Sequence, residues 1–137
     1  MKTKKIGMQI GIFAIGAIAF VALVVFGVQS WMRLTSDVEH YAYLVKRNPE
    51  NFEYHEMYGY ALQDAGRFVE AEREYRLELN LRPASKSGRY LLGKTLVAQG
   101  RYSEAQKELR LALDGARPPL ARDIRAELDA LPPIINR

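Results

Sequence analysis

The chain has 137 residues, enough for one modest domain, and a formal net charge of +4. It contains no cysteine, which excludes disulfides, thiolate metal sites, covalent haem attachment and cysteine nucleophiles. The charge is uneven, because residues 33–80 hold six Lys or Arg and ten Asp or Glu, whereas residues 81–137 hold eleven and six. A nucleic-acid-binding domain would show a dominant basic face, so we predict no nucleic-acid partner.

A basic tail at residues 1–5 precedes an apolar run over residues 6–28, in which Gln9 is the only strongly polar residue. As a helix this run is about 34 Å long, enough to cross a bilayer core of about 30 Å. We therefore predict a single transmembrane helix at residues 6–30, surrounded by membrane lipid. The run is longer than the apolar part of a signal peptide, so we expect an uncleaved anchor. Small residues at 17–19 and 28–30 leave cleavage open as the alternative.

The residues that flank the apolar run predict its orientation. Lys2, Lys4 and Lys5 lie before it, and only Arg33 follows it closely. By the positive-inside rule, the N-terminus is expected in the cytoplasm and the remaining chain across the membrane, which is the periplasm if the membrane is a bacterial inner membrane. Trp31, together with Arg33, is expected to anchor the chain at the membrane interface.

Small residues recur along one face of the predicted transmembrane helix. Gly7 and Gly11 form a GxxxG pattern, and Ala14 continues the same face. Such residues let a second helix approach closely, so we predict a contact with a helix of another subunit. The alternative is a plain lipid-facing surface.

Residues 31–50 are expected to form a juxtamembrane linker and a capping helix. Ser36 and Glu39 have the spacing of a capping box, which predicts that a helix begins there and ends before Pro49.

A ten-residue stretch then occurs twice. GRFVEAEREY at residues 66–75 returns as GRYSEAQKEL at residues 100–109, an offset of 34. At the same offset Asn51 matches Ser85 as a helix N-cap, and Gly66 matches Gly100 at a helix end. Small residues that permit close helix packing also match, at Gly59 and Gly93 and at Ala71 and Ala105. Each repeat is therefore predicted to be two antiparallel helices with a buried seam.

The 34-residue period and these matched positions resemble the tetratricopeptide repeat family. The resemblance implies an all-α protein: a single N-terminal transmembrane helix followed by a short solenoid of helical hairpins. Two full repeats are expected at residues 51–84 and 85–118, with flanking partial repeats. Residues 119–137 are expected to hold a C-terminal capping helix, with Leu120, Ile124, Leu128 and Leu131 on one face.

The resemblance also implies a partner groove lined by the first helix of each repeat. The matching positions carry acidic and aromatic residues beside one lysine, which suggests a mixed or basic partner segment, the alternative being simple solvation. The predicted groove residues are Glu53, Glu56, Tyr60, Gln63, Asp64, Tyr90, Lys94 and Val97, with Ser87 and Ala98 at two further matching positions.

No pattern in the sequence indicates catalysis. His40 and His55 have no second ligand at metal spacing, and His55 occupies an aromatic packing position, where a structural role is expected. We interpret the carboxylates at 70, 72, 74 and 78, with the arginines between them, as a solvated face of ion pairs. No phosphate-binding loop or nucleophile motif occurs. We therefore predict no enzyme activity, no cofactor, no metal and no small-molecule substrate.

Two functions stay open at this point. The first is a non-catalytic accessory or scaffold subunit of a larger membrane complex, such as a respiratory or photosynthetic assembly, that binds other subunits through the repeats and the membrane helix. The second is a membrane-tethered assembly chaperone that holds client polypeptides while an envelope or cytochrome complex matures.

Overall fold

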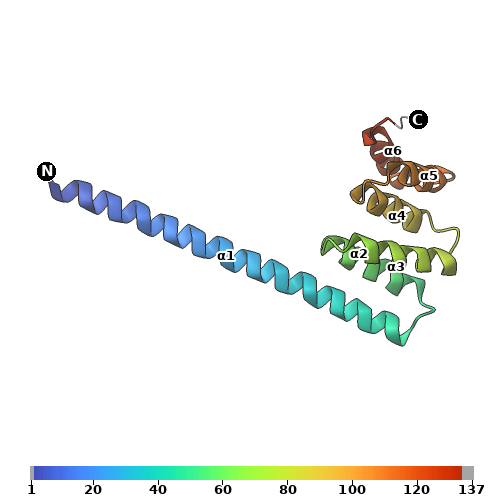
Figure 1. Cartoon of the computed structure of the whole chain (residues 1–137), viewed down its shortest axis with the longest axis horizontal. Helices are drawn as coiled ribbons and strands as arrows, with labels where there is room; N and C mark the ends of the chain where they lie inside the picture. The colour runs from blue at the N-terminus through green and yellow to red at the C-terminus, as the bar shows by residue number, and fades with distance from the viewer. Residues whose placement is uncertain (1, 134–137) are drawn as a thin grey trace. The chain divides into compact units, whose positions relative to one another are not determined.

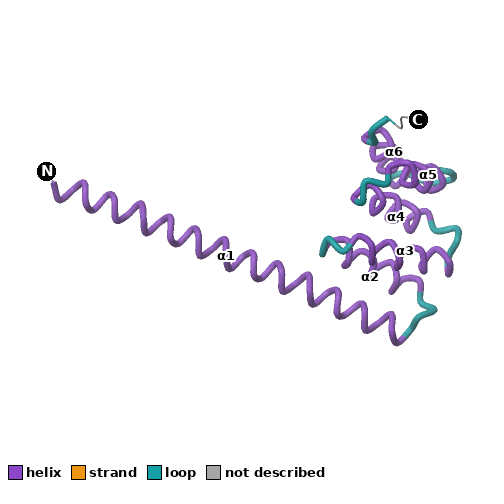
Figure 2. Tube along the Cα trace, in the orientation of Figure 1, coloured by secondary structure: helices purple, strands orange, loops and turns teal. Residues whose placement is uncertain are grey.

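A computed structural model describes the backbone of residues 2–133, and the side-chain surroundings of residues 18–33, 35 and 37–133. Over the described backbone the chain is helical with short turns and no strand, which confirms the all-α prediction (Figures 1 and 2). The chain divides into two compact units, Met1–Thr35 and Ser36–Arg137. The helices are α1 (Lys2–Arg47), α2 (Phe52–Asp64), α3 (Phe68–Leu81), α4 (Lys86–Ala98), α5 (Tyr102–Leu113) and α6 (Leu120–Ala130).

Helix α1 is continuous from Lys2 to Arg47, so the prediction that a helix begins at Ser36 is wrong. No proline or glycine interrupts residues 28–48. The Thr35 hydroxyl donates to the carbonyls of Trp31 and Met32, at 3.2 and 2.9 Å, as hydroxyls do inside a helix. The capping pattern is therefore overridden because the residues before it already favour helix.

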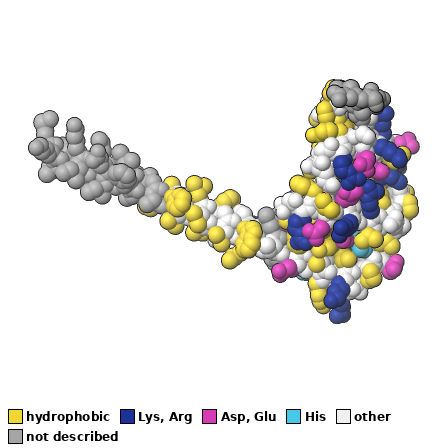
Figure 3. All heavy atoms as spheres, viewed as in Figure 1, with side chains coloured by type: hydrophobic (Ala, Val, Ile, Leu, Met, Phe, Trp, Pro, Cys, Tyr) yellow, Lys and Arg dark blue, Asp and Glu magenta, His cyan; other side chains and the backbone are white. Residues whose placement is uncertain are grey.

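The described part of α1 in the first unit exposes its apolar side chains (Figure 3). Ile18, Leu23 and Phe26 are each 69–71% exposed. Within the described residues, α1 is the one helix that is long and apolar enough to cross a membrane by length and composition, with a mean hydropathy of 1.6 in its most apolar window. These apolar side chains are left uncovered by the described residues of the unit.

The helix pairs begin and end as the repeat predicts. The Asn51 side chain accepts a hydrogen bond from the Glu53 backbone N–H at 2.9 Å, and the Ser85 hydroxyl accepts one from Gly88 at 3.0 Å. Gly66 and Gly100 follow the first helices with φ of 74° and 73°, a conformation that glycine adopts without strain. Both predicted N-caps and both predicted turns are confirmed.

Small residues let the helices of each pair approach closely. A Cβ at Gly59 would lie 2.7 Å from the Tyr75 ring, and a Cβ at Gly93 would lie 2.7 Å from Leu109. Ala71 and Ala105 are fully buried. Together with Tyr75, the buried leucines at 62, 92 and 96 fill the first core, and residues of α5 and α6 form a second.

The final helix closes the stack. Ile124 of α6 is fully buried beside Leu109 and Ala112 of α5, and Leu120, Leu128 and Leu131 pack around them. The predicted apolar face of the capping helix is confirmed.

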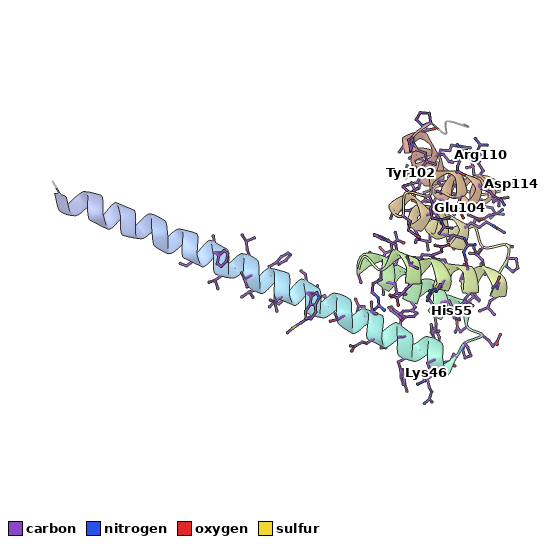
Figure 4. The ribbon with its side chains drawn as sticks, viewed as in Figure 1. Lys46, His55, Tyr102, Glu104, Arg110 and Asp114 are labelled. Carbon is purple, nitrogen blue, oxygen red and sulfur yellow. The ribbon has the colours of Figure 1, made fainter. Side chains whose placement is uncertain are left out.

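Helix α3 is not the uniformly solvated face predicted from its charges. Glu72 and Glu78 are buried, and Glu74 accepts from the His55 ring at 2.8 Å. The other ring nitrogen of His55, Nε2, bonds the Pro49 carbonyl at 2.8 Å, so this buried histidine is structural, as expected (Figure 4). Charges spaced i,i+4 indicate a helix but not which side of that helix faces the core. The spacing therefore did not reveal that two of the carboxylates are buried.

Candidate interaction surface

The first helices of the pairs form one continuous layer, because α4 contacts both α2 and α6. We call the side chains that these helices present away from α3 and α5 the first-helix face. All eight predicted groove residues belong to α2 or α4.

One end of this face is hollowed. A cavity of about 500 Å³ lies where the N-terminal ends of α2 and α4 meet the last turns of α1. Of the predicted groove residues, Glu53 and Glu56 line it. The Arg82 guanidinium, also at its edge, lies 4.8 Å from the centroid of the Phe52 ring. The lining residues are Tyr41, Phe52, Glu53, Tyr54, Glu56, Met57, Arg82 and Ser87.

Farther along α2, Tyr60 and Asp64 are exposed. With Glu56 they lie near the phenol of Tyr75, whose pKa is raised first by burial and then by these three neighbours. Gln63 has a different role: it accepts hydrogen bonds from Tyr75 at 3.1 Å and from Thr95 at 3.3 Å. It therefore joins α2, α3 and α4.

On α4, two of the predicted residues, Tyr90 and Lys94, lie beside the second core. Tyr90 packs against that core, and the ammonium of Lys94 lies 5.6 Å from the centroid of its ring. The pKa of Tyr90 is raised by burial, and then by Glu127 and Asp123 of α6. Val97 packs against the first core instead. The structure thus places the eight residues on adjacent helices, and two of them, Glu53 and Glu56, line the cavity at the N-terminal end of α2.

Several residues of the cavity escaped the sequence analysis. Tyr41 lies 34 residues before Tyr75, so one further step of the repeat register would have found it. No sequence pattern marks Met57 or Arg82, because both reach the cavity only through the packing of helices that are separated in the chain.

Glu78 is a fully buried carboxyl group that packs over Gly88, the residue next to the cavity-lining Ser87. Neither of its oxygens has a hydrogen-bond partner, and burial raises its pKa. The carboxyl fills the space over Gly88, where any Cβ would overlap it. The sequence predicted Glu78 on a solvated face of ion pairs, so its complete burial corrects that interpretation.

The predicted membrane-side residues are on α1. Trp31 is 66% exposed, and Arg33 is also exposed. Gly7, Gly11 and Ala14 lie in α1, but their side chains fall outside the described residues, so the predicted helix contact stays a prediction. Among the residues that the structure describes, no group of three or more His, Asp or Glu could hold a metal ion.

Paired helices at a 34-residue period, with glycine turns and a small-residue seam, define a tetratricopeptide-like helical repeat fold. Solved structures support this class. The type III secretion translocator chaperone SycD of Yersinia enterocolitica has a TM-score of 0.68 and 17% identity, over 77% of this chain and 76% of its own. SycD in complex with a peptide of the translocator YopD gives a TM-score of 0.67, with 17% identity, over 77% and 84%.

Two further structures share the fold. The TPR2B domain of yeast Sti1, in a complex with pHsp70, has a TM-score of 0.66 and 19% identity, over 73% of this chain and 83% of its own. MamA of AMB-1 has a TM-score of 0.58 and 27% identity, over 68% and 52%. No protein-family model matches the chain. No curated protein matches it either.

Proposed function

We propose that the protein is a non-catalytic, membrane-anchored interaction module that binds a segment of a partner protein on its first-helix face. In the favoured form it is an accessory or scaffold subunit of a larger membrane complex. The observation that carries the proposal is the pairing of an uncovered apolar helix with a repeat stack that leaves aromatic and acidic side chains exposed on one face.

The anchor follows from the energetics of α1. Apolar side chains from Ile18 to Val28 are 46–71% exposed, apart from the small residues between them. Leaving such a run in water is costly, at roughly 25 cal/mol per Å² of apolar surface, whereas lipid removes the cost. The basic residues before the run favour a cytoplasmic N-terminus.

Partner binding is supported by the fold and by the surface. Helical repeats present extended surfaces on which proteins and peptides dock. SycD with its translocator peptide shows that a stack of this shape holds a polypeptide segment in that protein. On this chain, Tyr60 is 53% exposed and Met57 is 47% exposed, both on α2. Aromatic residues of this kind are common anchors of interfaces.

The test is native electrophoresis of membranes solubilised in mild detergent. We expect the wild-type protein to migrate in a complex, and Tyr60→Ala with Tyr90→Ala to weaken that complex while the helical content stays unchanged. Tyr102→Ala is the matched control, because Tyr102 is exposed on α5, away from the first-helix face. A wild-type protein that migrates free would contradict the scaffold form.

The likeness to a secretion chaperone favours one alternative, a membrane-tethered assembly chaperone that holds clients transiently. The two forms differ in stoichiometry. A scaffold subunit co-purifies in a fixed ratio with mature partners, whereas a chaperone is recovered only with clients that are still being assembled. Pulse-labelling followed by affinity purification separates them.

A further inference from the structure

The cavity on the first-helix face is bordered by more negative than positive charge. Glu53 and Glu56 form no ion pair among the described residues, and the only bond found for the Glu56 carboxylate comes from the Ser87 hydroxyl at 3.3 Å. The one cation at the edge, Arg82, lies over the Phe52 ring. Beside the carboxylates lie Tyr41 and Met57, which offer apolar surface.

Glu78 supplies a second, independent observation. Its carboxyl is fully buried, and neither oxygen has a hydrogen-bond partner. A line of polar groups leads from it to the cavity wall: the Ser85 hydroxyl beside Glu78 lies 3.2 Å from the Ser87 hydroxyl, which in turn donates to Glu56. A buried carboxyl without partners is costly, and natural proteins keep few of them.

We propose that this cavity receives a lysine or arginine side chain of the partner segment, and that Glu78 provides the buried counter-charge. The proposal rests on the function proposed above and specifies the chemistry of the partner. The ammonium or guanidinium contacts Glu53 and Glu56 at the cavity wall, and its alkyl stem lies along Tyr41 and Met57, as long cationic side chains do on apolar surface.

The charged and polar groups around Glu78 determine its pKa, and so how readily it loses a proton when a cation binds nearby. Burial raises the pKa of Glu78 most, and the neighbouring Ser85 hydroxyl lowers it, although the two groups do not meet in the geometry of a hydrogen bond. Glu56 of α2 raises this pKa further, whereas Arg82 in the α3–α4 turn and Arg89 of α4 lower it. A cation at Glu56 offsets the repulsion between the two carboxyl groups. Glu78 then loses its proton more easily, so binding of the partner releases protons.

The experiment uses the full chain in nanodiscs of neutral phosphatidylcholine and a library of short peptides built from Lys, Glu, Leu and Gly. We expect the recovered peptides to be enriched in Lys. The double variant Glu53→Gln and Glu56→Gln should lose this enrichment and keep its helical content. Asp114→Asn is the matched control, since Asp114 is an exposed carboxylate at the end of α5 (Figure 4).

Calorimetry of one recovered peptide, in two buffers of different ionisation enthalpy, tests the role of Glu78. Wild-type protein should release protons on binding at a pH above the ordinary carboxyl pKa of 4.5, because the raised pKa of Glu78 keeps this group partly protonated there, and Glu78→Gln should not. Because binding is coupled to loss of the Glu78 proton, we expect wild type to bind the peptide more tightly as the pH rises, and Glu78→Gln to lose that pH dependence.

Three results would overturn the proposal: no recovered peptide, peptides without Lys enrichment, or enrichment that persists in the Glu53 and Glu56 variant. Equal proton release by Glu78→Gln would overturn the counter-charge. A complex in native electrophoresis together with any of these results would reject only this inference and leave the interaction module standing.

Discussion

At the scale of single residues, the packing of Glu78 over Gly88 departs most from the repeat pattern. The equivalent residue of the next repeat, Ala112, is fully buried and apolar. In the first repeat, a carboxyl occupies the space that a side chain at residue 88 would fill. The two residues therefore depend on each other: glycine at 88 is needed because glutamate stands at 78.

A double-mutant cycle tests whether Gly88 and Glu78 depend on each other. Gly88→Ala alone should destabilise the repeats by about 1–3 kcal/mol, because the added methyl overlaps the buried carboxyl. In a Glu78→Ala background the clash is gone, and the same change should stabilise by about 1 kcal/mol, the helix preference of alanine over glycine. Denaturant unfolding of the full chain in micelles, followed by circular dichroism, measures each step. Equal effects of Gly88→Ala in both backgrounds would show that the residues are not coupled.

At the scale of helices, Glu72 joins one hairpin to the next. Its carboxylate accepts from Arg101 at 2.6 Å and from Gln99 at 2.9 Å, both in the α4–α5 turn, and from Arg76 of its own helix at 2.9 Å. Burial raises the pKa of Glu72, but the three hydrogen bonds outweigh it, so the pKa is lowered overall. This buried bridge links α3 to the second repeat.

Removing the bridge should destabilise the stack. We expect Glu72→Ala to cost about 1–3 kcal/mol, because Arg101 and Gln99 lose a charged partner. Glu70→Ala is the matched control. Glu70 pairs with Arg67, three residues away on the surface, and both side chains are 44–45% exposed, so the cost should be about 0–0.5 kcal/mol. The same denaturant measurement applies. Similar costs for the two variants would contradict the bridging role.

The pH dependence of this effect has a definite sign. Because the folded-state pKa of Glu72 lies below the ordinary value of 4.5, its contribution is present above that value and is lost as the pH falls through the folded-state pKa. The difference between wild type and Glu72→Ala should therefore shrink in acid.

At the scale of the whole molecule, the chain joins a long apolar helix to a tetratricopeptide-like repeat unit. The basic residues before the apolar run predict that the repeats lie outside the cytoplasm. The chain has no cysteine of its own, so single cysteines report topology without background.

We expect a cysteine at Ser103, an exposed residue of α5, to react with a membrane-impermeant thiol reagent in bacterial spheroplasts. A cysteine at Thr3 is the control and should react only after the membrane is broken. The reverse pattern would place the repeats in the cytoplasm. Labelling at neither position in intact spheroplasts would also contradict the predicted orientation.

Much of the fold could be predicted from the sequence, because the repeat makes each local signal appear twice. The helix caps at Asn51 and Ser85 and the turns at Gly66 and Gly100 involve backbone groups only a few residues away. Their effect can therefore be predicted from the local sequence. The helix start predicted at Ser36 failed for the opposite reason: a cap can act only where the preceding residues leave the helix, and these do not.

The sequence by itself determined the repeat, its turns and caps, the seam of small residues and the apolar length of α1, since each depends on spacing along the chain. Only the tertiary structure decided which charges are buried. Three glutamates of α3 look equivalent in the sequence but have different surroundings. Glu70 forms an exposed ion pair, Glu72 bridges the two repeats, and Glu78 is buried without a hydrogen-bond partner. The reason is physical: the free energy of a carboxylate depends on the solvent and partners around it, and these come from other helices.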